Sequence, residues 1–157
     1  MPPTLRALEL AIPPAAVAAI AALAMWGISL VTPSIPASPA VRGVAAAILA
    51  GAGVCLSLSG VASFRRARTT VNPMKPDAAS TLVRSGVYRV TRNPMYLGFL
   101  VVLLAWAAFL ANLPVLTVPP AFVLYMNRFQ IGPEERALSA RFGRAYAEYE
   151  GEVRRWL

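Results

Sequence analysis

The 157-residue chain has no histidine and a single cysteine, Cys55. Without histidine, it can form neither a Ser-His-Asp triad nor a histidine-ligated zinc site. One cysteine alone excludes a disulfide within the chain and a metal site built from clustered thiolates. These absences remove two common routes to hydrolysis, and no metal is expected.

Charge is also scarce, at 14% of residues against roughly 25% in soluble domains. It is missing from three long runs, residues 10–41, 43–64 and 93–127. A helix needs roughly 20 apolar residues to cross a bilayer, so runs of this length are candidate membrane spans. With 57% hydrophobic residues overall, the sequence predicts an all-α integral membrane protein.

The third of these runs is too long for one helix, and Asn112 followed by Pro114 gives a turn signal near its middle. We therefore expect about four transmembrane helices, the last two forming a short hairpin. The expected spans are residues 7–31, 41–64, 96–111 and 114–129. The proline pair at 13–14 is expected to start or kink the first helix, and the pair at 119–120 to bend the fourth, because proline lacks the N–H of a helix hydrogen bond.

The chain is expected to form a single membrane domain, residues 1–157. Its successive parts are two N-terminal spans (1–64), a loop (65–95), the helical hairpin (96–131) and a C-terminal helical cap (132–157). In the cap, apolar residues recur every three or four positions from Leu138 to Trp156. This pattern is typical of a helix that covers a membrane surface or a cavity. Gly151 is expected to break or bend that helix.

The net charge of +8 is concentrated in two places. Basic residues gather in the loop 65–95 and after the fourth span, whereas the connections at 32–40 and 111–114 carry no charge. By the positive-inside rule, both termini and the loop 65–95 face the cytoplasm. Basic residues there also favour anionic headgroups of membrane lipids. Topology and lipid contact account for the charge, and no nucleic-acid partner is expected.

Small residues recur along the second span: Gly43, Ala47, Gly51, Gly53, Ser57 and Gly60. Small residues at four-residue spacing let helices approach closely inside a membrane. The pattern is compatible with helix packing within the subunit and also with a homodimer through this face.

Two polar clusters follow apolar runs at the same expected membrane surface. The first is the run Arg92-Asn93-Pro94-Met95-Tyr96-Leu97-Gly98, and the second joins Arg128 to the pair Glu134-Glu135. Arginines can serve as interfacial anchors, and acidic residues in a first turn complement a helix dipole. The Asn-Pro and Tyr-x-Gly elements have no such role. We therefore interpret the two clusters as two walls of one site.

The run from Arg92 to Gly98 resembles the R-[HN]-P-x-Y-x-G signature of the isoprenylcysteine carboxyl methyltransferases and the related phospholipid methyltransferases. Residues 82–89 resemble the segment that leads into this signature, and residues 134–156 resemble the family's E-E-x-x-L-x-x-x-F-G-x-x-Y-x-x-Y tail. The resemblance covers residues 81–157, with the spacing intact in both blocks. Asn93 stands where the isoprenylcysteine enzymes usually have histidine, which bears on the substrate more than on the cofactor.

The resemblance implies a helical membrane enzyme that binds S-adenosylmethionine at the cytoplasmic surface and receives a lipid-like or lipid-anchored substrate from the membrane. The implied cofactor residues are Val83, Gly86, Tyr88, Arg92, Asn93, Pro94, Tyr96, Leu97 and Gly98, with Glu134 and Glu135 closing the pocket. Glutamates suit the ribose hydroxyls or the ammonium of this cofactor, and an arginine suits its carboxylate. Methyl transfer by in-line displacement needs positioning and exclusion of water.

The acceptor class stays open between a carboxylate and an amine. A carboxylate is already a nucleophile, and Arg128 would hold it by a charged hydrogen bond. An amine must first lose a proton, for which Glu135 is the candidate base. Two other interpretations remain: an NADPH-dependent membrane reductase related to the sterol reductases, which share a similar C-terminal signature, and a non-enzymatic four-helix membrane protein.

Overall fold

The computed structural model describes residues 8–69, 74 and 79–157. The helices are α2 (Pro14–Val31), α3 (Pro39–Arg66), η2 (Gly86–Arg89), α4 (Pro94–Leu110), η3 (Pro114–Thr117), α5 (Val118–Tyr125), η4 (Met126–Ile131), α6 (Gly132–Phe142) and α7 (Arg144–Glu152). The elements η2 and η3 are 3-10 turns, and η4 is a π-helix. No strand occurs in the part of the chain that the structure describes, so the all-α class is confirmed.

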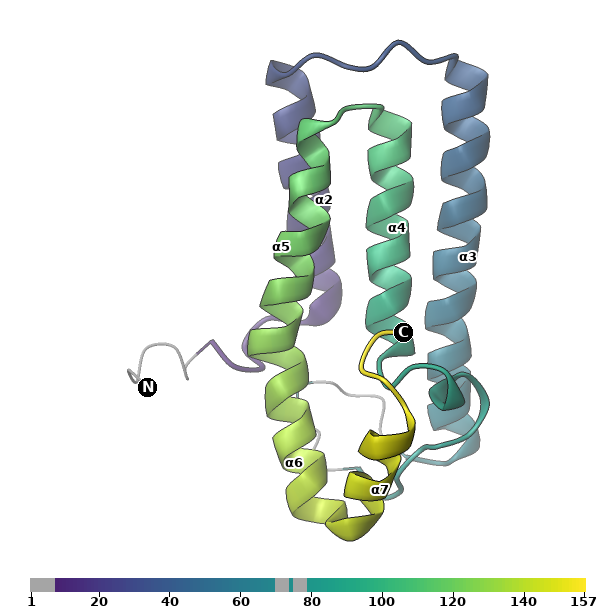
Figure 1. The fold of residues 1–157 in the computed structure, drawn as a ribbon, viewed down its shortest axis with the longest axis vertical. Helices are drawn as coiled ribbons and strands as arrows, with labels where there is room; N and C mark the ends of the chain where they lie inside the picture. The colour runs from purple at the N-terminus through teal and green to yellow at the C-terminus, as the bar shows by residue number, and fades with distance from the viewer. Residues whose placement is uncertain (1–7, 70–73, 75–78) are drawn as a thin grey trace.

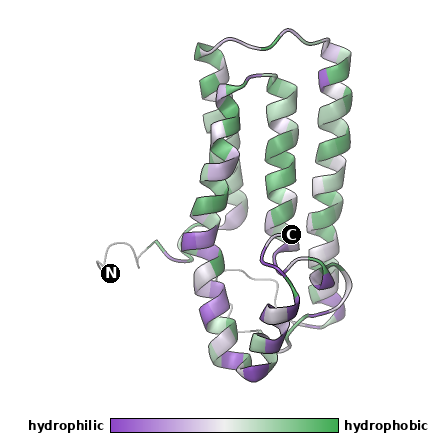
Figure 2. Cartoon of the chain, viewed as in Figure 1, coloured by the Kyte–Doolittle hydropathy of each residue, from purple (hydrophilic) through white to green (hydrophobic). Residues whose placement is uncertain are grey.

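The long helices stand side by side as a bundle, with α4 packed against α3, α2 and α5, and the helices α6 and α7 lie at one end (Figure 1). Two of them, α2 and α3, are long and apolar enough to cross a membrane, and α4 is a shorter apolar helix of 17 residues. Only 17% and 11% of the apolar windows of α2 and α3 are buried inside the protein. The long helices are mostly hydrophobic, and hydrophilic residues gather on α6 and α7 (Figure 2). Many large apolar side chains of α2 and α3 are exposed, a distribution that suits contact with lipid.

Prolines set where several helices begin. Pro14 and Pro94 each occupy the first position of a helix, where the missing N–H costs no hydrogen bond. The first long helix therefore begins at Pro14 rather than at residue 7. The prolines at 119–120 lie in the first turn of α5, directly after the 3-10 turn η3. At the place where a bend was expected, the chain changes from a 3-10 helix to an α-helix.

The turn between α4 and α5 lies where the sequence predicts it. Ala111 ends α4 in the left-handed conformation, with φ +46°. The side chain of Asn112 donates from Nδ2 to Thr32 Oγ1 at 2.8 Å, and its Oδ1 accepts from the backbone N–H of Val115 at 3.3 Å. Asn112 therefore joins this turn to the end of α2 and also starts the next helical segment.

Close approach of α3 and α4 depends on small residues. A Cβ at Gly98 would stand 2.1 Å from Ser57 Oγ and 2.5 Å from the carbonyl oxygen of Gly53. This part of the small-residue series therefore packs within the subunit. A Cβ at Gly43 or Gly51 would meet nothing within 4 Å, and a homodimer through that part of α3 stays a prediction.

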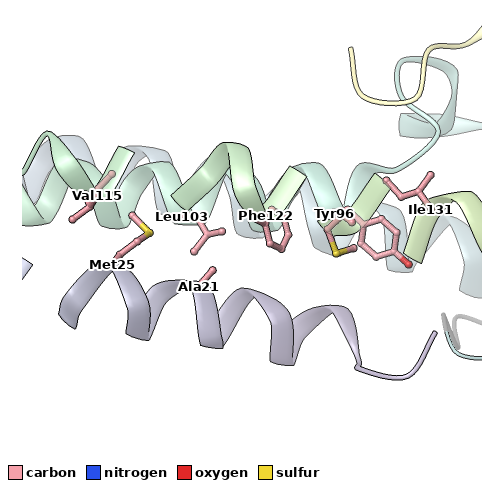
Figure 3. Packing of buried hydrophobic residues seen from close by; sticks show 9 residues of the cluster. Ala21, Met25, Tyr96, Leu103, Val115, Phe122 and Ile131 are labelled. Carbon is pink, nitrogen blue, oxygen red and sulfur yellow. The ribbon is translucent and has the colours of Figure 1, made fainter. Parts of the chain in front are cut away.

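The buried core of the bundle joins α2, α4, α5 and the turns that flank α5 (Figure 3). Its members are Ala21, Met25, Tyr96, Leu103, Ala107, Val115, Phe122, Met126 and Ile131. Tyr96 and Ile131 stand together at one end of this row, near the start of α6. The packing that holds the bundle together therefore also fixes the ring of Tyr96 beside the polar end of the molecule.

The second arm of the hairpin continues directly into the C-terminal cap, since α5, η4 and α6 follow one another without an intervening loop. What changes is the helix type, which is π over Met126–Ile131. Pro133 gives a physical reason. In an α-helix its ring would clash with the carbonyl group of Phe129, four residues earlier, and a wider turn relieves that clash.

The C-terminal cap consists of two helices. Helix α6 ends at Phe142, and Gly143, with φ +51°, turns the chain into α7. Gly151 lies inside α7, so the prediction of a break there was wrong. A positive φ is a conformation that glycine adopts at little cost, which explains a break at Gly143. Across this turn the apolar residues still pack together, because Leu138 and Phe142 of α6 contact the buried cluster that contains Tyr146 and Tyr149 of α7.

Candidate active site

A cavity of about 90 Å³ lies at the polar end of the bundle, where the start of α4 meets α6, α7 and the segment before η2. Predicted site residues that line it are Val83, Tyr88, Arg92, Asn93, Tyr96, Glu134 and Glu135. Lining residues that were not predicted as site residues are Phe64, Ala79, Thr81, Leu82, Met95, Leu138, Tyr146 and Tyr149. The structure thus brings the two polar clusters of the sequence together around one cavity.

Four other predicted residues shape the backbone near the cavity without lining it. Gly86 begins η2 at φ +63°, a conformation that suits glycine. Pro94 is the first residue of α4, and the backbone N–H of Leu97 donates to Asn93 O at 2.9 Å. Gly98 faces α3. Pro94 and Leu97 thus mark the start of α4, Gly86 allows the backbone turn into η2, and Gly98 lets α4 approach α3 closely.

Arg128, the fifth residue outside the lining, has a different partner. Its Nη1 lies 2.6 Å from Glu9 Oε1, and Arg136 pairs with the other oxygen of the same carboxylate. The Arg128 guanidinium also lies over the ring of Phe129, 5.1 Å from its centroid. These contacts tie η4 to the segment before α2. The predicted role of Arg128 in holding an acceptor carboxylate finds no support in the cavity lining.

Glu134 is held by two hydrogen-bond donors. The hydroxyl of Tyr96 and Nε2 of Gln130 each lie 2.5 Å from Glu134 Oε1. Burial raises the pKa of the Glu134 carboxyl to about 7, although both hydrogen bonds act to lower it. A carboxyl group with a pKa near neutrality can exchange a proton under physiological conditions, which is common at functional sites.

Glu135 lies between two guanidinium groups. Arg155 donates from Nε at 3.0 Å and from Nη2 at 2.5 Å to its two oxygens, a bidentate arrangement. Nη2 of Arg92 lies 3.2 Å from Glu135 Oε1. Glu135 is therefore engaged in holding the C-terminal segment against α6 and the start of α4.

The side chain of Arg92 is only 9% exposed, yet its donors are not all used. Its Nε has no hydrogen-bond partner within the described ranges. Its Nη1 lies 2.6 Å from Glu150 Oε1, but off the line of a hydrogen bond. Leaving a buried donor unpaired costs about 1–3 kcal/mol. A carboxylate that reached Nε would satisfy this donor.

Thr91 is fully buried beside the motif, and nothing in the sequence singled it out. Its Oγ1 donates to the carbonyl oxygen of Arg155 at 3.2 Å and accepts from the N–H of Asn93 at 3.2 Å. Nδ2 of Asn93 donates to the same carbonyl oxygen at 2.9 Å. The start of α4 is therefore tied to the C-terminal residues by main-chain acceptors, which local sequence patterns do not reveal.

Aromatic rings form a wall of the cavity. The hydroxyl of Tyr149 donates to Tyr88 O at 2.8 Å, and the ring of Phe64 meets that of Tyr88 edge to face, 5.2 Å between centroids. Burial raises the pKa of Tyr88 and Tyr146, and that of Tyr149 to about 12, so these hydroxyls stay protonated at neutral pH. Neutral aromatic rings beside a glutamate suit a positively charged ligand.

Residues 41–145 match the model of the phospholipid methyltransferase family. The chain belongs to this family. It is 44% identical over 63 residues to an uncharacterized protein of Haemophilus influenzae, a match that covers 40% of this chain and all of that protein. No solved structure matches the chain.

Two plant proteins are also similar. Identity is 43% over 75 residues with a probable protein-S-isoprenylcysteine O-methyltransferase of Oryza sativa subsp. indica, covering 46% of this chain and 38% of that protein. Identity is 32% over 104 residues with protein-S-isoprenylcysteine O-methyltransferase B of Arabidopsis thaliana, a match that covers 64% of this chain and 51% of that protein. The chain thus spans about half, or less, of these plant methyltransferases. The resemblance predicted from the sequence is confirmed, and family and relatives together support a methyltransferase.

Proposed function

We propose that this member of the family transfers a methyl group from S-adenosylmethionine to a lipid-like acceptor at the cytoplasmic surface of a membrane. The single observation that carries the proposal is the cavity lined by both Arg92, whose Nε has no hydrogen-bond partner among the described residues, and Glu134. Family membership supports methyl transfer, and the cavity supports the choice of methyl donor.

The donor groups of the lining fit this cofactor. The unpaired N–H of Arg92 matches a carboxylate, and Glu134 matches ribose hydroxyls or an ammonium group. The neutral ring of Tyr88 matches a positive centre. When bound, the cofactor supplies a methyl group on a positively charged sulfur. The residues of the chain bind it, orient it and exclude water.

Binding requires the cavity to open. Its volume of about 90 Å³ is below the roughly 300–1,000 Å³ of sites that take drug-sized ligands. The pair between Arg92 and Glu150 is the contact that a bound carboxylate would replace, because the Glu150 side chain is 44% exposed and can turn toward solvent. We propose that cofactor binding releases Glu150 and separates α7 from the start of α4.

For an amine acceptor, we propose Glu134 as the base in place of Glu135. The pKa of Glu134, raised by burial to about 7, suits removal of a proton at physiological pH. Glu135, by contrast, is held by Arg155 and Arg92. A carboxylate acceptor needs no base, and in that case Glu134 acts only in binding.

An apolar groove of about 670 Å³ supports a lipid-like acceptor. It runs along α4, between alanines of α2 and α3, over the side chains of Phe99, Val102 and Trp106. Tyr96 lines the cavity and Phe99, nearly one turn further along the same helix, lines the groove. A hydrocarbon chain lying in the groove would bring its polar end to the cavity.

We also propose that the bundle crosses the membrane four times, with the cavity and both termini on the cytoplasmic side. Hydrophilic residues gather at the cavity end of the bundle (Figure 2), whereas the connections at 32–40 and 111–114 carry no charge. The positive-inside rule supports this orientation.

Calorimetric titration of the purified protein in detergent tests the proposal. S-adenosylmethionine and its demethylated product are expected to bind saturably, and NADPH is expected not to bind. Arg92→Ala and Glu134→Ala are expected to abolish binding in folded protein, whereas Arg144→Ala, a change of a 93% exposed side chain on α7, is expected to leave it intact. Binding of NADPH alone would favour the reductase, and no binding by folded protein would contradict the proposal.

A further inference from the structure

The π-helix η4 lies between the apolar bundle and the glutamates of the cavity. A π-turn holds about one residue more than an α-turn, and one residue of an α-helix corresponds to a rotation of about 100°. The type of this turn therefore decides which way the following helix faces. In the structure, Gln130 at its end and Glu134 in α6 both face Tyr96.

On one side, η4 is held by the segment that precedes α2. The backbone N–H of Leu10 donates to the carbonyl oxygen of Phe129 at 2.9 Å. The α-helical partner of that carbonyl would be Pro133, which has no N–H to donate. Glu9, next to Leu10, pairs with Arg128 of η4 and with Arg136 of α6, and the Glu9 side chain is only 16% exposed.

On the other side, η4 is held by the C-terminal segment. Nε1 of Trp156 donates to Asn127 Oδ1 at 3.0 Å. The main-chain oxygen of Asn127 accepts from the N–H of Gly132, the five-residue bond that defines a π-helix. A Cβ at Gly132 would lie 3.1 Å from that oxygen, so glycine gives this bond room.

We propose that Glu9 and Trp156 are positioning residues for Glu134. Pro133 disfavours the α-helical form of η4, and the contacts of Glu9 and Trp156 fix the wide turn in one arrangement, which holds Gln130 and Glu134 against Tyr96. Without these contacts η4 could shift, α6 would turn with it, and Glu134 would leave the cavity. This inference rests on the proposed function, because its consequence for activity is the loss of a cofactor ligand.

A double-mutant cycle on the whole protein tests the inference, with the affinity for S-adenosylmethionine as its readout. Trp156→Phe removes the N–H and keeps an aromatic ring, and Glu9→Gln removes the charge. Each is expected to weaken binding about 3- to 10-fold in the otherwise unchanged protein, roughly the worth of one hydrogen bond. In a Glu134→Gln background each is expected to change affinity less than about 2-fold, because the positioned group is already altered. Glu148→Gln, which breaks an exposed pair on α7, is the matched control and is expected to change neither.

The result that overturns the inference is an equal loss in both backgrounds, which a merely structural role produces, or no loss in either. If the unchanged protein does not bind the cofactor, the proposed function fails, and a second readout, the titration of Glu134, still tests the positioning.

The titratable groups facing the Glu134 carboxyl are Tyr96, Tyr88 and Glu135. Its infrared band, assigned by its loss in Glu134→Gln, is expected to titrate at lower pH in Trp156→Phe, because a carboxyl that leaves the cavity loses the burial that raises its pKa. An unchanged titration overturns the inference.

Discussion

Among single residues, Glu134 gives the site its dependence on pH. Burial raises the pKa of its carboxyl from 4.5 to about 7, so below pH 7 the folded protein holds this carboxyl neutral. The fold without cofactor binds a proton that the unfolded chain releases above about pH 4.5, so this group's contribution to stability falls as pH rises from about 4.5 to 7. The affinity for the cofactor is expected to change with pH in the opposite direction, because the ionised form of Glu134 attracts an ammonium group.

We therefore predict that the affinity for S-adenosylmethionine rises with pH up to about 7 and then levels off. Below the pKa of Glu134, each pH unit is expected to weaken binding about tenfold, in proportion to the ionised fraction. Calorimetric titrations between pH 5.5 and 8.5 measure this. Glu134→Gln is expected to bind more weakly with a flat profile, and a midpoint near pH 7 that persists in this variant would assign the effect to another group.

Residues with a local motif were predictable, and their partners were not. The spacing of Arg92, Tyr96 and the glutamate pair is visible in the sequence, and these residues line the cavity. The contact between Arg128 and Glu9 joins residues 119 positions apart, and the carbonyl oxygen of Arg155 meets Thr91 across 64 positions. Hydrogen bonds to main-chain oxygens over such distances depend on the fold as a whole and leave no pattern in the sequence.

For individual elements, the close contact of α3 and α4 gives a prediction for stability. Gly98→Ala places a Cβ against Ser57 and the backbone of Gly53, and overpacking of this kind costs typically about 1–3 kcal/mol. We expect a lower unfolding temperature in detergent. Gly51→Ala is the matched control, because a Cβ there meets nothing within 4 Å. Equal unfolding temperatures for both variants would mean that the two helices are further apart than in this structure.

The groove along α4 gives a prediction for substrate use. Ala47→Phe fills the groove, so we expect methylation of a long-chain acceptor to fall at least tenfold while the affinity for S-adenosylmethionine stays unchanged. Farnesylcysteine and phosphatidylethanolamine vesicles, assayed with labelled cofactor, cover both acceptor classes. Ala52→Phe, at an exposed position of α3 outside the groove, is expected to retain activity. A loss shared by both variants would place the acceptor elsewhere.

The ends of most helices follow from local chemistry, whereas the π-helix does not. The start of the first long helix at the proline pair 13–14 and the turn at Asn112 were predicted correctly, because each acts on its own backbone. The break in the cap falls at Gly143 because both it and Gly151 are permissive and only packing decides between them. The sequence predicts a separate cap from residue 132, but the helix of the hairpin continues into it and widens before Pro133, which requires knowing that α5 and α6 follow one another without a loop.

For the whole molecule, the two polar clusters meet because they follow an even number of passes along the bundle. The run from Arg92 lies at the start of α4, and Glu134 lies beyond the end of α5, so a hairpin of two similar lengths returns the second cluster to the first. This much was predictable from the lengths of the apolar runs. Which side chains point into the cavity was not, since the register of α6 is set by η4.

Four crossings with the cavity in the cytoplasm predict how cysteines react in whole cells. In a Cys55→Ser background, Ser34→Cys and Leu113→Cys place exposed thiols in the uncharged connections, and Ser139→Cys places one on α6. A membrane-impermeant maleimide is expected to label the first two in intact cells, and Ser139→Cys only after lysis, because translocating the arginine-rich end is unfavourable. The Cys55→Ser parent should stay unlabelled. Labelling of Leu113→Cys and Ser139→Cys from the same side would mean that the hairpin does not span the membrane, and labelling of Ser139→Cys alone in intact cells would invert the orientation.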